Sequence, residues 1–187
     1  EQKKTLETLI DESRADSSFY LFLGGSSIIT SLGFIIDSSV IVIGGMLVAP
    51  LLFPILSLGM GITTGSKGGI FRSLVTIGKS ILLVLFISLV TAFLFDGVSS
   101  GNVLALASTA SIAHFFVAFI SGLMAAFAWV KQDINSSLPG IAVSVSLLPP
   151  LSAIGVGLAL LDKSVVSGGL MLFILNFVGI VAAAMLI

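Results

Sequence analysis

Six mainly apolar stretches follow one another along this chain, and each is long enough to cross a lipid bilayer as a helix. An α-helix rises about 1.5 Å per residue, so about 20 residues cross a hydrocarbon core of roughly 30 Å. With 57% hydrophobic and 9% charged residues, the chain has too few polar residues to cover a water-soluble domain. We therefore expect an all-α integral membrane protein whose first partner is the lipid bilayer.

Charged and turn-forming residues divide these stretches into six expected transmembrane helices, and helices 2 and 5 contain prolines. Residues 1–16 mix acids and bases around leucines, which predicts a cytoplasmic amphipathic lead-in and no cleavable signal peptide. We expect residues 17–95 to hold helices 1–3 and residues 108–187 to hold helices 4–6. The expected helices lie within 17–36, 40–66, 71–95, 108–130, 139–161 and 165–187.

The distribution of lysine and arginine predicts the orientation, because positive residues stay preferentially on the cytoplasmic side of short loops. If the amino terminus is cytoplasmic, the only basic residue outside is Lys163. This predicts a multi-pass protein with both termini in the cytoplasm. The basic residues then placed inside are Lys3, Lys4, Arg14, Lys67, Arg72, Lys79 and Lys131.

The chain also contains an internal repeat at an offset of 96 residues. This offset places LLFPILSLGMGI (51–62) over LLPPLSAIGVGL (147–158), and helices 1 to 3 over helices 4 to 6. Because each unit has an odd number of helices, the second unit has the opposite orientation in the membrane. The sequence therefore predicts two inverted repeats of three helices, an architecture of many secondary transporters.

Proline in a helix removes an amide donor from the carbonyl four residues earlier, so Pro54 frees the carbonyl of Pro50 and Pro150 that of Ser146. We therefore expect helices 2 and 5 to be broken and to form a substrate site near the membrane midplane. The alternative is that the prolines only kink the helices. The candidate substrate-binding residues are Pro50, Pro54, Ser57, Ser146, Pro149, Pro150 and Asn176.

Two further features of the repeat concern packing and polar contacts. Glycines allow helix backbones to approach closely, so the glycines of the repeat are expected to serve helix packing more than to line a permeation path. Asn176, midway along helix 6, is expected to hydrogen-bond across helices or to line a cavity, and its counterpart in the first unit is Ser80. The glycines concerned are Gly44, Gly45, Gly59, Gly61, Gly155 and Gly157.

Three segments together resemble a known family: GGMLVAPLLFPILSLGMGI (44–62), AVSVSLLPPLSAIGVGLAL (142–160) and FILNFVGIVAAA (173–184). They are similar to the uncharacterised prokaryotic hydrophobic membrane proteins grouped as domain-of-unknown-function family 389. The resemblance extends from Ser17 to nearly the end of the chain. It implies placement in a prokaryotic inner or plasma membrane, and it implies no particular activity.

The absence of certain residues and motifs reduces the number of possible functions. No Asp or Glu falls within an expected span, the chain has no cysteine, and Gly-x-Ser-x-Gly and HExxH motifs are absent. We therefore expect no enzyme, no metal and no cofactor, and a net charge of −1 predicts no nucleic-acid partner.

Two functions remain open. The first is a transporter or channel-like protein that moves a small polar or anionic solute, or an ion, between helices 2 and 5. The alternative is a scaffold or sensor that oligomerises and couples to a soluble domain outside this sequence. A homo-oligomer is expected in either case.

Overall fold

The computed structural model describes residues 16–95, 101–130 and 137–186, with only the backbone described at 129–130 and 137–145. Within these ranges every regular element is a helix. The predicted lead-in lies outside the described residues except for Asp16, which caps α2 by accepting a hydrogen bond from the amide of Phe19 at 2.8 Å. The helices are α2 (Ser17–Ile35), α3 (Ser39–Met46), α4 (Leu52–Thr63), α5 (Lys67–Leu94), α6 (Asn102–Ala107), α7 (Ile112–Val130), α8 (Ser137–Ala159) and α9 (Lys163–Met185).

Several of these helices are suited to a membrane. Helices α2, α5 and α9 are each long and apolar enough to cross one, and α3 with α4 meets the same requirement as a pair bent by 58°. Among the residues with described side chains, α7 and α8 contribute shorter apolar stretches, Ile112–Ala128 and Ser146–Ala159. The structure thus contains three candidate spans, or four with the bent pair counted as one.

The prolines have different effects in the two predicted broken helices. The expected helix 2 is observed as α3 and α4, with an interruption between Met46 and Leu52. There Pro50 supplies no amide and disfavours helical geometry in the preceding residue. The expected break in helix 5 is wrong, because α8 stays helical through Pro149 and Pro150. In α8 a neighbouring helix supplies a donor to one of the carbonyls that lose their helical donor, as described below.

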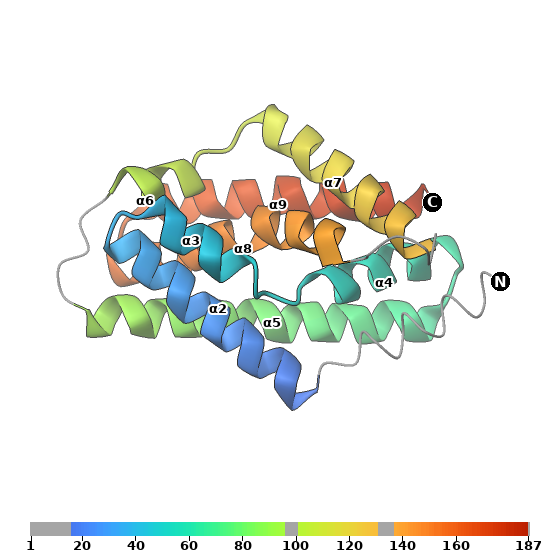
Figure 1. Cartoon of the computed structure of the whole chain (residues 1–187), viewed down its shortest axis with the longest axis horizontal. Coiled ribbons are helices and arrows are strands. Elements are labelled where there is room, and N and C mark those ends of the chain that lie inside the picture. The colour runs from blue at the N-terminus through green and yellow to red at the C-terminus, as the bar shows by residue number, and fades with distance from the viewer. Residues whose placement is uncertain (1–15, 96–100, 131–136, 187) are drawn as a thin grey trace.

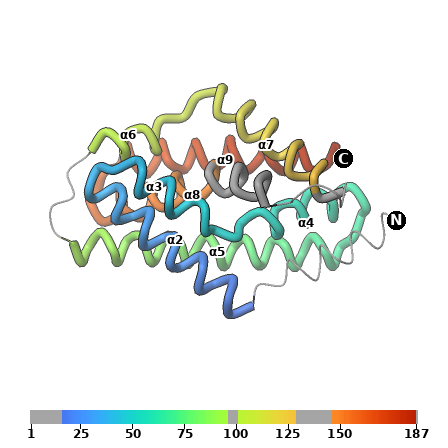
Figure 2. Tube along the Cα trace, in the orientation of Figure 1, coloured from blue at the N-terminus to red at the C-terminus, as the bar shows by residue number. Residues whose placement is uncertain are grey.

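The helices form a bundle whose longest members run in opposite directions. Figure 1 shows α5 and α9 running antiparallel, and likewise α4 and α8. Helix α4 packs on α9, α8 packs on α5, and α7 lies on α9 (Figures 1 and 2). The α8–α9 turn and the turn after α2 lie at one end, whereas the α4–α5 turn lies at the other end with the carboxyl terminus.

A short helix, α6, lies between the expected helices 71–95 and 108–130, and the next helix, α7, begins at Ile112 and not at the expected Ser108. The first turn of α6 is capped by a residue far away in the sequence. Asp37, in the turn after α2, accepts a hydrogen bond from the amide of Val103 at 2.8 Å. The carboxylate thus satisfies one of the amides that a helix start leaves unpaired.

The turns that precede α5 and α9 have the same geometry. Gly65 has a φ of 68°, and Leu161, which follows it by 96 residues, has a φ of 55°. In both turns the next residue donates its amide across the end of the preceding helix, as in a Schellman motif. These hydrogen bonds join Ser66 N to Gly61 O and Asp162 N to Gly157 O, both at 2.9 Å.

The second residue of each repeated turn caps the helix that follows it. Ser66 Oγ accepts from the amide of Gly69 at 3.3 Å, and Asp162 Oδ1 accepts from the amide of Val165 at 3.3 Å. The hydroxyl of Ser164, then the amides of Val165 and Ser164, hold the pKa of Asp162 below its ordinary value. Both α5 and α9 thus begin at residues that favour a helix start.

A close glycine contact between helices also occurs at two places that are 96 residues apart in the sequence. A Cβ atom added at Gly155 of α8 would lie 2.8 Å from the carbonyl oxygen of Leu85 in α5. One added at Gly59 of α4 would lie 3.2 Å from the carbonyl oxygen of Val181 in α9. Since Gly155 follows Gly59 by 96 residues and Val181 follows Leu85 by 96, equivalent residues form both contacts.

These contacts predict that Gly155→Ala lowers stability by about 1–3 kcal/mol, because the added methyl would meet backbone that cannot move aside without shifting α5. Thermal unfolding in detergent micelles measures this change. Gly78→Ala in α5 is the control, because no atom lies within 4 Å of the added Cβ. Alanine there should stabilise the helix slightly. Equal Tm changes for both variants would contradict the proposed close contact.

Candidate functional site

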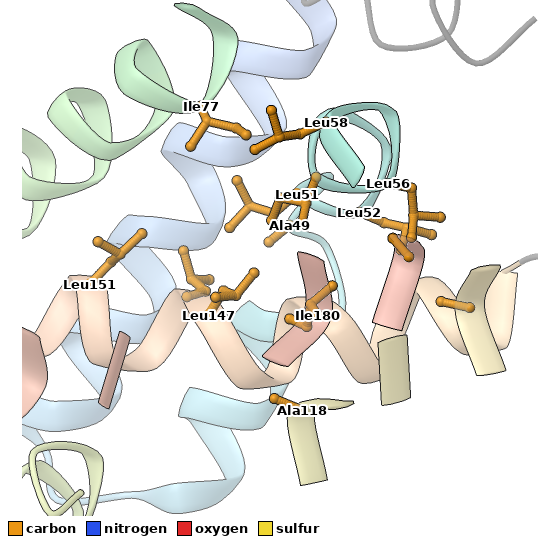
Figure 3. Packing of buried hydrophobic residues seen from close by; sticks show 14 of the residues in the cluster. Ala49, Leu51, Leu52, Leu56, Leu58, Ile77, Ala118, Leu147, Leu151 and Ile180 are labelled. Carbon is orange, nitrogen blue, oxygen red and sulfur yellow. The ribbon is translucent and has the colours of Figure 1, made fainter. Parts of the chain in front are cut away.

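The two proline-containing segments meet at the centre of the bundle. Ala49 and Leu51, between α3 and α4, belong to the same buried cluster as Leu147 and Leu151 of α8. Figure 3 shows these side chains converging with Ile180 of α9. The structure therefore brings the break between α3 and α4 next to the prolines of α8, and the contact between them is apolar.

Asn176 of α9 makes the main polar contact beside this junction. Its side chain is 4% exposed, and Nδ2 donates to the carbonyl oxygen of Ser146 at 2.6 Å. Residue 150 would normally donate its amide to that carbonyl, but Pro150 has no amide hydrogen. Asn176 therefore replaces the missing donor of α8. Side-chain hydrogen bonds between membrane helices contribute on average about 0.6 kcal/mol and at most about 1.7 kcal/mol.

The other half of the Asn176 amide is unsatisfied. Its Oδ1 atom is buried and has no hydrogen-bond partner among the described residues. The orientation of the amide follows from its contact with Ser146, because the reversed orientation would place two acceptor oxygens 2.6 Å apart. A buried acceptor without a partner costs about 1–3 kcal/mol, so this oxygen is a place where a ligand or water would be stabilised.

Several buried hydroxyls share this unsatisfied state. Within the described part of the chain they lie on the inward faces of α2, α4, α5 and α8, and among them only Ser57 was a candidate from sequence. On α5, serines recur about two turns apart on the inner face, at 73, 80 and 88, which is the pattern that could have found them. The hydroxyls without partners are those of Ser26, Thr30, Ser57, Ser73, Ser88 and Ser152.

The six candidate glycines occupy separate contacts and do not line one path. Gly44 faces open space, whereas a Cβ at Gly45 of α3 would meet the Thr30 hydroxyl of α2. Gly61 and Gly157 lie against the first turns of α5 and α9, and the cross-bundle contacts of the other two are described above. Likewise Ser80, the counterpart of Asn176, donates to its own helix at Thr76 O, at 2.8 Å.

The described residues contain no group of three His, Asp or Glu side chains that could hold a metal ion. The polar groups that the structure places at the centre are an amide, hydroxyls and a main-chain carbonyl.

Comparison with known proteins identifies the family. Residues 46–182 match the family model described as a domain of unknown function, DUF389, and the chain belongs to that family. It is also 24% identical over 164 residues to the uncharacterized protein MJ0678 of Methanocaldococcus jannaschii, a match that covers 87% of this chain and 50% of the archaeal protein. The chain thus spans about half the length of this relative. No solved structure matches.

The exchange of donors at Ser146 can be tested with a double-mutant cycle. Asn176→Leu should destabilise the protein by up to about 1.7 kcal/mol, because it removes the hydrogen bond that Asn176 donates to the Ser146 carbonyl from the neighbouring helix. In a Pro150→Ala background, residue 150 regains an amide for that carbonyl, so the same substitution should cost less. Chemical unfolding of the four proteins gives the coupling energy. Strictly additive effects would show that Asn176 does not replace the donor lost at Pro150.

Proposed function

We propose that this protein moves a small polar solute or ion across the membrane along a path between the break that separates α3 from α4 and the prolines of α8. The observation that carries the proposal is Asn176, whose buried Oδ1 has no partner among the described residues, beside the carbonyl freed by Pro150. Irregular or under-bonded backbone inside a bilayer is tolerated where it is buried in protein or lines a wet cavity.

The proposed architecture is six spans in two inverted units of three. Supporting it are the repeated turns, the repeated glycine contacts and the antiparallel course of α5 and α9. In transporters of this kind, substrate sites lie where the two units meet near the midplane. The junction of Leu51 with Leu147, which are themselves 96 residues apart, has this position in the bundle.

We further propose that both termini are cytoplasmic, in a prokaryotic inner or plasma membrane. Lys67 begins α5 at the end of the bundle that holds the carboxyl terminus, whereas Lys163 begins α9 at the opposite end. With Arg72 and Lys79 also in the first half of α5, positive charge is concentrated at one end, which supports the cytoplasmic placement of that end.

A second candidate is a membrane scaffold or sensor that oligomerises without transport. The apolar contact at the centre favours it, because Leu51, Leu147 and Leu148 are almost completely buried and close the junction. For a transporter, the same contact would be the closed state of the path. Flux measurements separate the two functions.

Purified protein in liposomes should increase the permeability to at least one member of a panel of small polar solutes and ions. Pro54→Ala and Pro150→Ala should each reduce this flux, because they restore amide donors to carbonyls at the junction. Gly78→Ala is the matched control, since it lies away from the junction in open space. Unchanged permeability across the panel, with both proline variants folded, would favour the scaffold.

The topology predicts that single cysteines at Ser39 and Thr64, both exposed, lie on opposite sides of the membrane. The sequence has no native cysteine, so each introduced thiol is the only target in this chain. In intact cells, a membrane-impermeant maleimide should label Ser39→Cys, whereas Thr64→Cys should need permeabilisation. Labelling of both in intact cells would contradict the proposed arrangement.

A further inference from the structure

One side of α5 carries two cations among exposed apolar side chains. Its members recur at alternating spacings of three and four residues, which places them along one side of a helix, and all of them are exposed. The described bundle thus leaves this side of α5 uncovered, in contact with the surroundings of the protein. The members, which we call the basic face of α5, are Arg72, Val75, Lys79, Leu82 and Phe86.

Lys79 lies well inside the length of α5. This helix ends at Leu94, at the end of the bundle that holds the turn after α2 (Figure 1). Lys79 precedes Leu94 by fifteen residues, or about 22 Å of helix. Since a hydrocarbon core is roughly 30 Å thick, the Cα atom of Lys79 lies within it, and the ammonium meets the headgroups only if the side chain extends toward them. A cation at this depth is costly without an anionic partner.

The acidic residues that the structure describes do not provide that partner. They are Asp16, Asp37 and Asp162, and each accepts a hydrogen bond from an amide in the first turn of a helix. None of the three forms an ion pair with Arg72 or Lys79. The basic face of α5 therefore has a charge that an anion from the surroundings can neutralise.

Comparison of the two units separates these cations from the needs of the fold. In α9 their equivalents, 96 positions further on, are Gly168 and Leu175, which are uncharged. A requirement of the repeated packing would apply to both units, whereas these cations occur in one. They lie in the half of α5 that begins at the end of the bundle assigned above to the cytoplasm. This asymmetry points to a partner on one side of the membrane.

We propose that the basic face of α5 binds an acidic phospholipid, with the phosphodiester at Lys79 and Arg72. An acyl chain of the same lipid then lies along Leu82 and Phe86, which are 69% and 66% exposed. Side chains of a helix point toward its amino-terminal end, so the Lys79 ammonium extends toward the headgroups. Anionic lipids attract basic residues at the membrane surface, whereas the choline of a zwitterionic lipid adds a positive charge. This binding does not depend on whether the protein transports a solute.

Native mass spectrometry of the purified full chain, released from detergent with added phosphatidylglycerol or phosphatidylcholine, measures this binding. Phosphatidylglycerol should bind more tightly. Lys79→Leu, which copies the second unit, should raise its Kd by about fivefold, equivalent to about 1 kcal/mol for one cation. Arg72→Gln added to Lys79→Leu should raise it further, whereas Lys79→Arg should keep the affinity. Lys163→Gln is the matched control, because it removes an exposed cation at the opposite end of the bundle.

Equal affinity for the two lipids, or an unchanged Kd in the double variant, would overturn the proposal. An equal loss in Lys163→Gln would also overturn it, because net charge alone would then explain the binding. Release of phosphatidylglycerol by an excess of inorganic phosphate would show a site for free anions without a role for the apolar side chains. Efficient disulfide-linked dimers of Leu82→Cys in membranes would assign this face to a second copy of the chain. Either result would reject the lipid site.

Discussion

The requirement that backbone polar groups find partners without water governs this structure. In a bilayer an unsatisfied carbonyl has no solvent to bond, so a helix with two adjacent prolines is stable only if something replaces the lost amides. Asn176 supplies one replacement by donating to Ser146 from the neighbouring helix. This contact gives a partner to one of the carbonyls that lose their helical donor at Pro149 and Pro150 in α8, whereas the chain is bent near Pro50; Ser80, the counterpart of Asn176, bonds within α5.

Close packing is the second constraint. Apolar side chains gain little by leaving lipid for one another, so helices in membranes associate through small residues that bring backbones together. Gly59 and Gly155 do this at the two contacts between the halves of the bundle. The repeated turns show the strength of local hydrogen bonding: Leu161 adopts a positive φ like Gly65, although a side chain disfavours that conformation.

Features with local causes could be predicted from the sequence, and features with distant causes could not. The starts of α2 and α9 lie within two residues of the expected ones and follow from caps at Asp16 and Asp162, whereas α5 begins four residues before the expected residue 71 because Ser66 caps it. The break at Pro50 is local as well. In contrast, α8 receives a hydrogen-bond donor from a residue 30 positions away, and α6 is capped by Asp37 from 66 residues away. For the site, the sequence identified Asn176 and Ser146 but missed the buried serines of α5, whose spacing of about two turns was the only local signal.

The paired glycine contacts have one more consequence. Gly59 of α4 lies against Val181 of α9, and Gly155 of α8 lies against Leu85 of α5, so residues 96 positions apart form both contacts. Such an arrangement is self-complementary, like the interface of a twofold symmetric dimer. A larger side chain at one of these glycines therefore disturbs one of two equivalent contacts and leaves the other in place. The equivalence does not extend to the polar contacts, because Asn176 of α9 donates to α8 whereas Ser80, 96 residues earlier, bonds within α5.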